Sequence, residues 1–140
     1  MAVSKKLYIA ESAFVAFVDR NHPKHKQASA YFRYFAQERY NLCTGYLTII
    51  EAYKIIFDEI SQSLARDFLR AITTGNINVL YPTESDIKAT IKVLVSSQSN
   101  ELDFKNAQME VFAYRNNINQ ILTFDFLPPL FGLVSFSLPI

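Results

Sequence analysis

The stretch Gln120-Ile-Leu-Thr-Phe-Asp125 (QILTFD) has the pattern of a short buried strand that ends in one carboxylate. Its apolar and β-branched residues favour a strand over residues 121–123, and Asp125 follows the carboxyl end of that strand. In open sheets of parallel strands, ligands bind just outside the carboxyl ends of the strands. The position of Asp125 therefore raises the question of which other acids lie beside it.

Segments of strand and helix character alternate along the whole chain. Strands are expected at 7–9, 41–44, 77–81 and 121–123, with a possible fifth at 133–136. Helices are expected at about 12–18, 28–35, 47–60, 61–75, 84–95 and 104–116, and Thr83 and Asp86 are spaced for a capping box. This alternation favours an α/β sandwich around a largely parallel sheet. No repeat or linker interrupts it, so we expect one domain over residues 1–140.

The composition is that of an ordinary globular protein and excludes several classes. Half of the 140 residues are hydrophobic and 19% are charged, which argues against disorder. The net charge of +1 gives no global attraction for nucleic acid, so RNA would have to be bound by a local patch. Cys43 is the only cysteine, which excludes an internal disulfide and favours a reducing, cytoplasmic location. The N-terminus has no long apolar run, so we expect no signal peptide and no membrane contact.

Four positions follow the expected strands or open the expected helices at the carboxyl edge of the sheet. Ala10 follows the first strand, and Glu51 lies about one turn into the helix after the second strand. Asn106 lies in the first turn of a later helix, and Asp125 follows the fourth strand. Three of these four side chains carry an oxygen that could bind a cation.

The segments around these positions resemble PIN domains, which are metal-dependent nucleases that include the VapC-type toxins of toxin–antitoxin pairs. The resemblance covers nearly the whole chain, and "ILTFDFLPPLFGLV", which contains Asp125, is its most specific stretch. "TGYLTIIEAYKI" places Glu51 at the position of the family's glutamate. "YIAESAFVAF" and "LDFKNA" have Ala10 and Asn106 where the family has acids. The resemblance implies a three-layer α/β/α sandwich with a short parallel sheet.

The same resemblance implies a nuclease centre. Mg²⁺ and Mn²⁺ are hard cations that prefer oxygen ligands, and a bound ion can activate a water for attack on a phosphodiester. Glu51 and Asp125 would hold the metal, and Glu51, Asn106 and Asp125 would form the catalytic set. Because Ala10 offers no ligand and Asn106 offers no charge, we expect weak or absent binding of Mg²⁺ or Mn²⁺ and a weakened or silenced centre.

Several neighbours have two open interpretations. Ser12 could hydrogen-bond a metal-bound water or cap the first helix. His22 and Lys24, in "DRNHPKHK", could contact an RNA phosphate or lie in a solvated loop. Glu11 and Asp103 could replace the missing charges, or act as a first-turn helix acid that points elsewhere and as an N-cap.

Two functions therefore remain open. The first is a metal-dependent ribonuclease of the toxin type, weakened or silenced by natural loss or by deliberate substitution of Ala10 and Asn106. The second is a non-catalytic PIN-like protein that binds RNA or serves as a scaffold for a protein partner. The resemblance implies RNA, an antitoxin protein and a second copy of the chain as partners. A run of four aromatics fits either such an interface or the core: Tyr31, Phe32, Tyr34 and Phe35.

Overall fold

A computed structural model describes residues 5–98, 102–125 and 133–137, and within them five strands form one sheet. The order of the strands is β3-β2-β1-β4-β5, and every neighbouring pair is parallel. Their bounds are β1 (Lys6–Ile9), β2 (Asn41–Gly45), β3 (Asn78–Leu80), β4 (Gln120–Leu122) and β5 (Val134–Ser135). The expected parallel sheet is thus confirmed. The later part of "ILTFDFLPPLFGLV", residues 126–132, lies outside the described residues.

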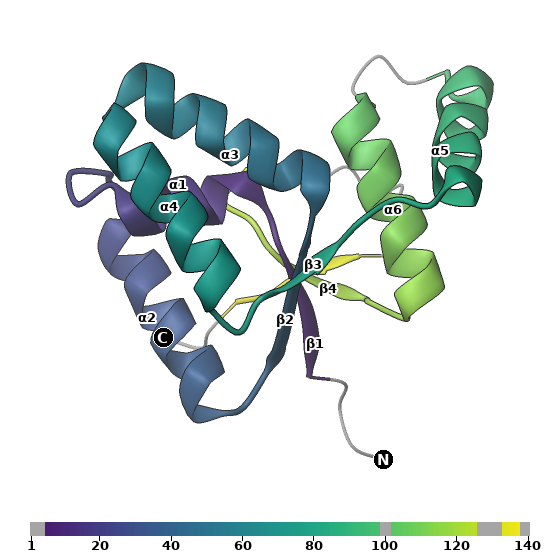
Figure 1. The fold of residues 1–140 in the computed structure, drawn as a ribbon. Coiled ribbons are helices and arrows are strands. Elements are labelled where there is room, and N and C mark those ends of the chain that lie inside the picture. The colour runs from purple at the N-terminus through teal and green to yellow at the C-terminus, as the bar shows by residue number, and fades with distance from the viewer. Residues whose placement is uncertain (1–4, 99–101, 126–132, 138–140) are drawn as a thin grey trace.

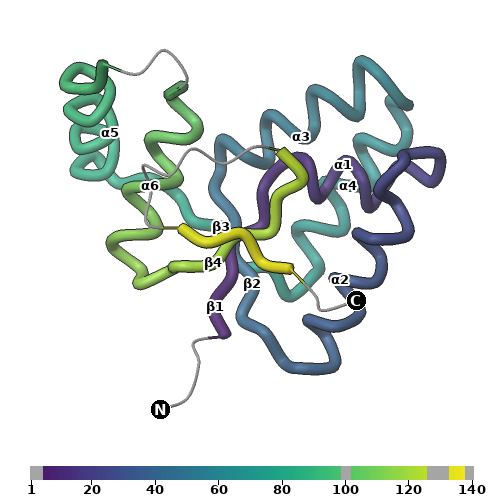
Figure 2. Tube along the Cα trace, turned by 180° about the vertical axis from the view of Figure 1, so that it is seen from behind, coloured from purple at the N-terminus to yellow at the C-terminus, as the bar shows by residue number. Residues whose placement is uncertain are grey.

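Helices cover both faces of the sheet, as Figure 1 shows. One face carries α1 (Glu11–Val18), α2 (His25–Gln37), α3 (Tyr46–Glu59) and α4 (Gln62–Thr74). The other carries α5 (Glu84–Ser96) and α6 (Phe104–Asn116), and the view from behind in Figure 2 shows the same separation. This confirms the three-layer α/β/α sandwich. No helix in the described ranges has both the length and the apolar character that a membrane crossing requires.

The alternation of side chains along β1 divides the core into two clusters. Leu7 and Ile9 face α1 to α4, whereas Tyr8 faces α6 and packs with Met109 and Phe112. All three β1 side chains are at most 1% exposed. The central strand is therefore buried on both faces, which is typical of parallel sheets.

The aromatic run on α2 packs inside the chain. Tyr31 and Phe35 are buried, and Phe32 and Tyr34 are partly buried against the same cluster. The ring of Phe136, which follows β5, lies 5.0 Å from that of Phe35. The core interpretation of this run is therefore the better one.

Local hydrogen bonds explain the bounds of two elements. The predicted capping box of α5 is present, with Thr83 and Asp86 each accepting a backbone N–H from the other. β4 ends at Leu122, one residue before its expected end, because the Thr123 hydroxyl accepts the backbone N–H of Asp125 at 3.1 Å. This local turn directs the chain out of the sheet at Asp125.

Candidate functional site at the carboxyl edge of the sheet

Three helices begin at the carboxyl edge of the sheet. α1 and α3 start directly where β1 and β2 end, at the upper edge of the sheet in Figure 1. α6 starts at the same edge, because Lys105 in its first turn contacts Glu11 in the first turn of α1. This edge is therefore where residues distant in the sequence meet.

Ser12 connects the start of α1 to the end of β4. Its hydroxyl accepts the backbone N–H of Phe124 at 2.9 Å and lies 3.2 Å from the Thr123 hydroxyl. Of the two interpretations of Ser12, the capping role is wrong, because the N-cap of α1 is Ala10, which has no side-chain acceptor. These contacts hold the backbone of Asp125 beside α1, while Asp125 itself is exposed.

An ion pair joins α1 to α6 at the centre of this edge. The Lys105 ammonium lies 2.5 Å from a Glu11 carboxylate oxygen, and the two side chains are only 19% and 14% exposed. Glu11 therefore points toward α6 rather than away from the edge. Burial tends to lower the pKa of Lys105, but Glu11, Asp103 and Glu51 raise it above its ordinary value. Glu51 of α3 thus acts on the same ammonium.

Ala10 and Asn106, the two positions that lack an acid of the PIN pattern, belong to parts of the chain that pack together. Ala10 follows β1, and Asn106 lies in the first turn of α6. Ala10 is 8% exposed and packs in the cluster that contains Met109, one turn beyond Asn106 on α6. The backbone N–H of Asn106 donates to the Asp103 carboxylate at 2.8 Å, so the N-cap interpretation of Asp103 is confirmed.

His22 and Lys24 lie elsewhere, in the connection between α1 and α2 at the left of Figure 1. The Lys24 backbone N–H donates to His22 Nδ1 at 3.0 Å. The eight residues of α1 span about 12 Å and separate this loop from Glu11. A phosphate contact by His22 or Lys24 stays a prediction.

The residues at this edge do not fit the divalent ion that the resemblance implies. Within 5–98, 102–125 and 133–137, no three His, Cys, Asp or Glu side chains gather closely enough to hold a metal. In addition, the Lys105 ammonium already bonds Glu11, and the charges of Asp103 and Glu51 help to raise its pKa. A divalent ion ~4 Å from that ammonium would be repelled by about 8 kcal/mol at an intermediate dielectric. Besides Ala10 and Asn106, which stand where the PIN pattern has acids, this edge therefore also carries the positive charge of Lys105.

Two exposed tyrosines extend the neighbouring strands β2 and β3. Gly45 and Leu80 are paired in the sheet, and Tyr46 and Tyr81 follow them. The two rings lie 5.6 Å apart at 38° and are 45% and 67% exposed. The sequence pattern did not single out these tyrosines or Lys105. The available signals were an aromatic residue directly after each strand and a lysine beside Asn106.

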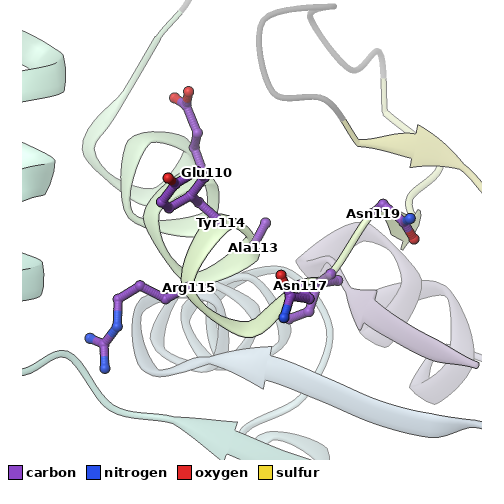
Figure 3. A pocket seen from close by; sticks show the side chains of 7 residues that line it. Glu110, Ala113, Tyr114, Arg115, Asn117 and Asn119 are labelled. Carbon is purple, nitrogen blue, oxygen red and sulfur yellow. The ribbon is translucent and has the colours of Figure 1, made fainter. Parts of the chain in front are cut away.

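A separate hollow lies at the other end of α6, as Figure 3 shows. It has a volume of about 660 Å³, and its lining includes Glu110, Tyr114 and Asn119. Burial raises the pKa of Glu110. Because Asn119 precedes β4, this hollow opens at the amino end of that strand, whereas Asp125 lies beyond its carboxyl end. It is therefore not part of the candidate site.

Comparison with known proteins supports the fold. No family model and no curated protein matches the sequence. The structure is similar to the crystal structure of VapC20 from Mycobacterium tuberculosis, a toxin that cleaves the sarcin–ricin loop, with a TM-score of 0.75. The match has 17% sequence identity and covers 85% of this chain and 89% of that chain. At this identity the likeness shows a common PIN-like fold.

Proposed function

We propose that this protein is an RNA-binding, PIN-like protein of the toxin-ribonuclease type whose nuclease centre is weakened or silenced. The main observation in favour of RNA binding is that Tyr46 and Tyr81 form an exposed pair of rings at the carboxyl edge. The likeness to a toxin that cleaves the sarcin–ricin loop supports the same class of ligand. The poor fit of the site to a divalent ion supports the loss of cleavage.

Exposed aromatic rings at this edge suit the recognition of unpaired bases. Proteins bind single-stranded or looped RNA by stacking its bases on aromatic side chains, which tolerates every base. Tyr46 opens α3, the helix that also carries Glu51. A base stacked on this pair would therefore bring its strand toward the site that contains Glu51 and Lys105.

The double substitution Tyr46→Ala and Tyr81→Ala is expected to weaken RNA binding by roughly tenfold, since stacking contributes about 1–3 kcal/mol per base. The measurement is fluorescence anisotropy with a labelled RNA hairpin that has an unpaired loop. Tyr46→Phe with Tyr81→Phe should keep the affinity, because the rings remain. Tyr114→Ala is the matched control, since Tyr114 is 87% exposed but lies on α6. No RNA binding by the unchanged protein would contradict the proposed function.

The silencing is tested by incubating the same hairpin with the unchanged protein in Mg²⁺ or Mn²⁺. The RNA is expected to stay intact on a denaturing gel, and metal-dependent cleavage would contradict silencing. A variant with Ala10→Asp and Asn106→Asp restores the two acids of the PIN pattern. Cleavage by that variant would favour a silenced nuclease over a protein that evolved for binding alone.

A second candidate function, binding of a protein partner, is favoured by the outer face of α5. Ile87, Ile91 and Val95 recur every four residues and are 40%, 47% and 81% exposed. The neighbouring face of α5, about 100° around the helix axis, buries Asp86 and Thr90. We propose that a second copy of the chain covers this stripe, because two stripes centred on Ile91 can pair antiparallel about a twofold axis. An antitoxin partner stays a prediction of the resemblance.

Replacing Ile91 with lysine is expected to convert such a dimer into a monomer, because the charge would be buried at the centre of the interface. Light scattering after gel filtration measures the mass. Lys88→Ala is the control, because Lys88 lies on the same helix in an exposed pair with Glu84. If the unchanged protein has the mass of a monomer at all concentrations tested, the dimer proposal is wrong.

A further inference from the structure

Lys105 is a cation at a position that disfavours cations. It lies in the first turn of α6, where the helix macrodipole carries partial positive charge. Its side chain is only 19% exposed, and removal from water further disfavours the charged form. An ammonium that stays charged there needs a strong source of negative potential.

Three elements of the fold supply that negative potential. Glu11 comes from the first turn of α1 and bonds the ammonium directly. Glu51 comes from α3, and Asp103 is the N-cap of α6 itself. All three carboxylates act to keep the lysine protonated, against the effect of burial. The centre therefore attracts a cation, and Lys105 is the cation that it holds.

We infer that Lys105 is the resident cation of this centre, and that its ammonium joins α1, α3 and α6 electrostatically where a PIN nuclease would use a divalent ion. The inference rests on the proposed silencing of the centre and explains how the centre stays assembled without a metal. With Lys105 present, no three acidic side chains among the described residues gather closely enough to hold a metal. Without its ammonium, Glu11, Glu51 and Asp103 would lack a counter-charge, and an added divalent ion would draw them together.

The test measures Mn²⁺ binding by calorimetry and melting temperature with and without Mn²⁺, using the full chain and no RNA. The unchanged protein is expected to show no binding and no shift in melting temperature. Lys105→Gln should bind Mn²⁺ roughly tenfold more tightly, or better, than the weakest binding that the calorimeter detects, because one repelling charge is gone, and should melt higher in Mn²⁺ than in EDTA. Lys105→Arg keeps the charge and should behave like the unchanged protein.

Lys88→Gln is the matched control, because it removes a lysine from an exposed pair and should not create Mn²⁺ binding. Mn²⁺ binding by the unchanged protein would overturn the inference, as would a folded Lys105→Gln variant that binds no better. If Lys105→Gln is unfolded in EDTA, refolding in Mn²⁺ supports the inference and failure to refold overturns it. Because RNA is absent, these outcomes are independent of whether the protein binds RNA.

Discussion

Replacing Arg115 with alanine is expected to lower the free energy of unfolding by about 3 kcal/mol, because it leaves a buried carboxylate without its counter-charge. That carboxylate belongs to Asp86, whose side chain is 2% exposed, whereas the Arg115 side chain is 50% exposed. The pair connects α5 to α6 and is the charged contact between these two helices among the described residues. Its loss should therefore loosen the whole layer that carries Lys105.

The pH dependence of this effect follows from the pKa of Asp86. Burial alone would raise that pKa, but hydrogen bonds from Arg115 and Thr83 and the charge of Arg115 lower it below 3.8. A lowered folded pKa contributes stability above the unfolded pKa, and this stability is lost as the pH falls through the folded pKa. In Arg115→Ala the buried carboxylate has a higher pKa and protonates first. The deficit of the variant should therefore be full at neutral pH, begin to shrink as the pH falls through the raised folded pKa of Asp86 in the variant, and vanish below its lowered folded pKa in the unchanged protein.

Urea denaturation of the unchanged protein and of Arg115→Ala at several pH values measures this deficit. Adding Asp86→Asn to Arg115→Ala should restore part of the stability at neutral pH, because the unpaired charge is removed. The control is Arg70→Ala, whose partner Asp67 is 59% exposed, and it should cost less than about 1 kcal/mol. Equal losses in the free energy of unfolding for Arg70→Ala and Arg115→Ala would show that the burial of Asp86 does not increase the cost of removing its partner.

Local patterns in the sequence predicted the elements but not the contacts between them. The capping box of α5 was predictable because Thr83 and Asp86 are three residues apart and the helix itself sets their geometry. The pairing of Asp86 with Arg115 was not, because the two residues are 29 positions apart and meet only when α5 packs on α6. Periodicity fixes which face of a helix is apolar, but it does not fix which helix that face will meet.

In the candidate site, too, the sequence predicted where the elements lie but not which side chains contact one another. The alternation of strands and helices placed Glu51 and Asn106 near the carboxyl edge, and Lys105, next to Asn106, is indeed influenced by Glu51. One of the two interpretations of Glu11 had it point elsewhere, yet it bonds Lys105 from a position 94 residues away. The direction of a side chain at the first turn of a helix depends on the packing of three elements. The sequence therefore predicts the edge but not the ion pair within it.

Gly45→Ala is expected to destabilise the protein by about 3 kcal/mol, at the upper end of the usual cost of overpacking. A Cβ at Gly45 would lie 2.6 Å from the Tyr8 hydroxyl and 3.1 Å from the ring of Phe112. Neither group can move away easily, because Tyr8 is 1% exposed and Phe112 is 2% exposed. The Tyr8 hydroxyl also accepts the Gly45 backbone N–H at 2.9 Å and lies 2.7 Å from the Thr48 hydroxyl.

This contact fixes the start of the helix that carries Tyr46 and Glu51, since Gly45 is the N-cap of α3. Tyr8→Phe removes the hydroxyl that the new Cβ would meet, at a cost of about 1–3 kcal/mol for the buried groups left without a partner. The double variant Gly45→Ala with Tyr8→Phe should therefore lose less stability than the sum of the two single variants. Urea denaturation of all four proteins measures this coupling. Strict additivity would mean that the clash is with Phe112 alone. No loss of stability in Tyr8→Phe would mean that the Tyr8 hydroxyl does not hold α3 in place at the carboxyl edge.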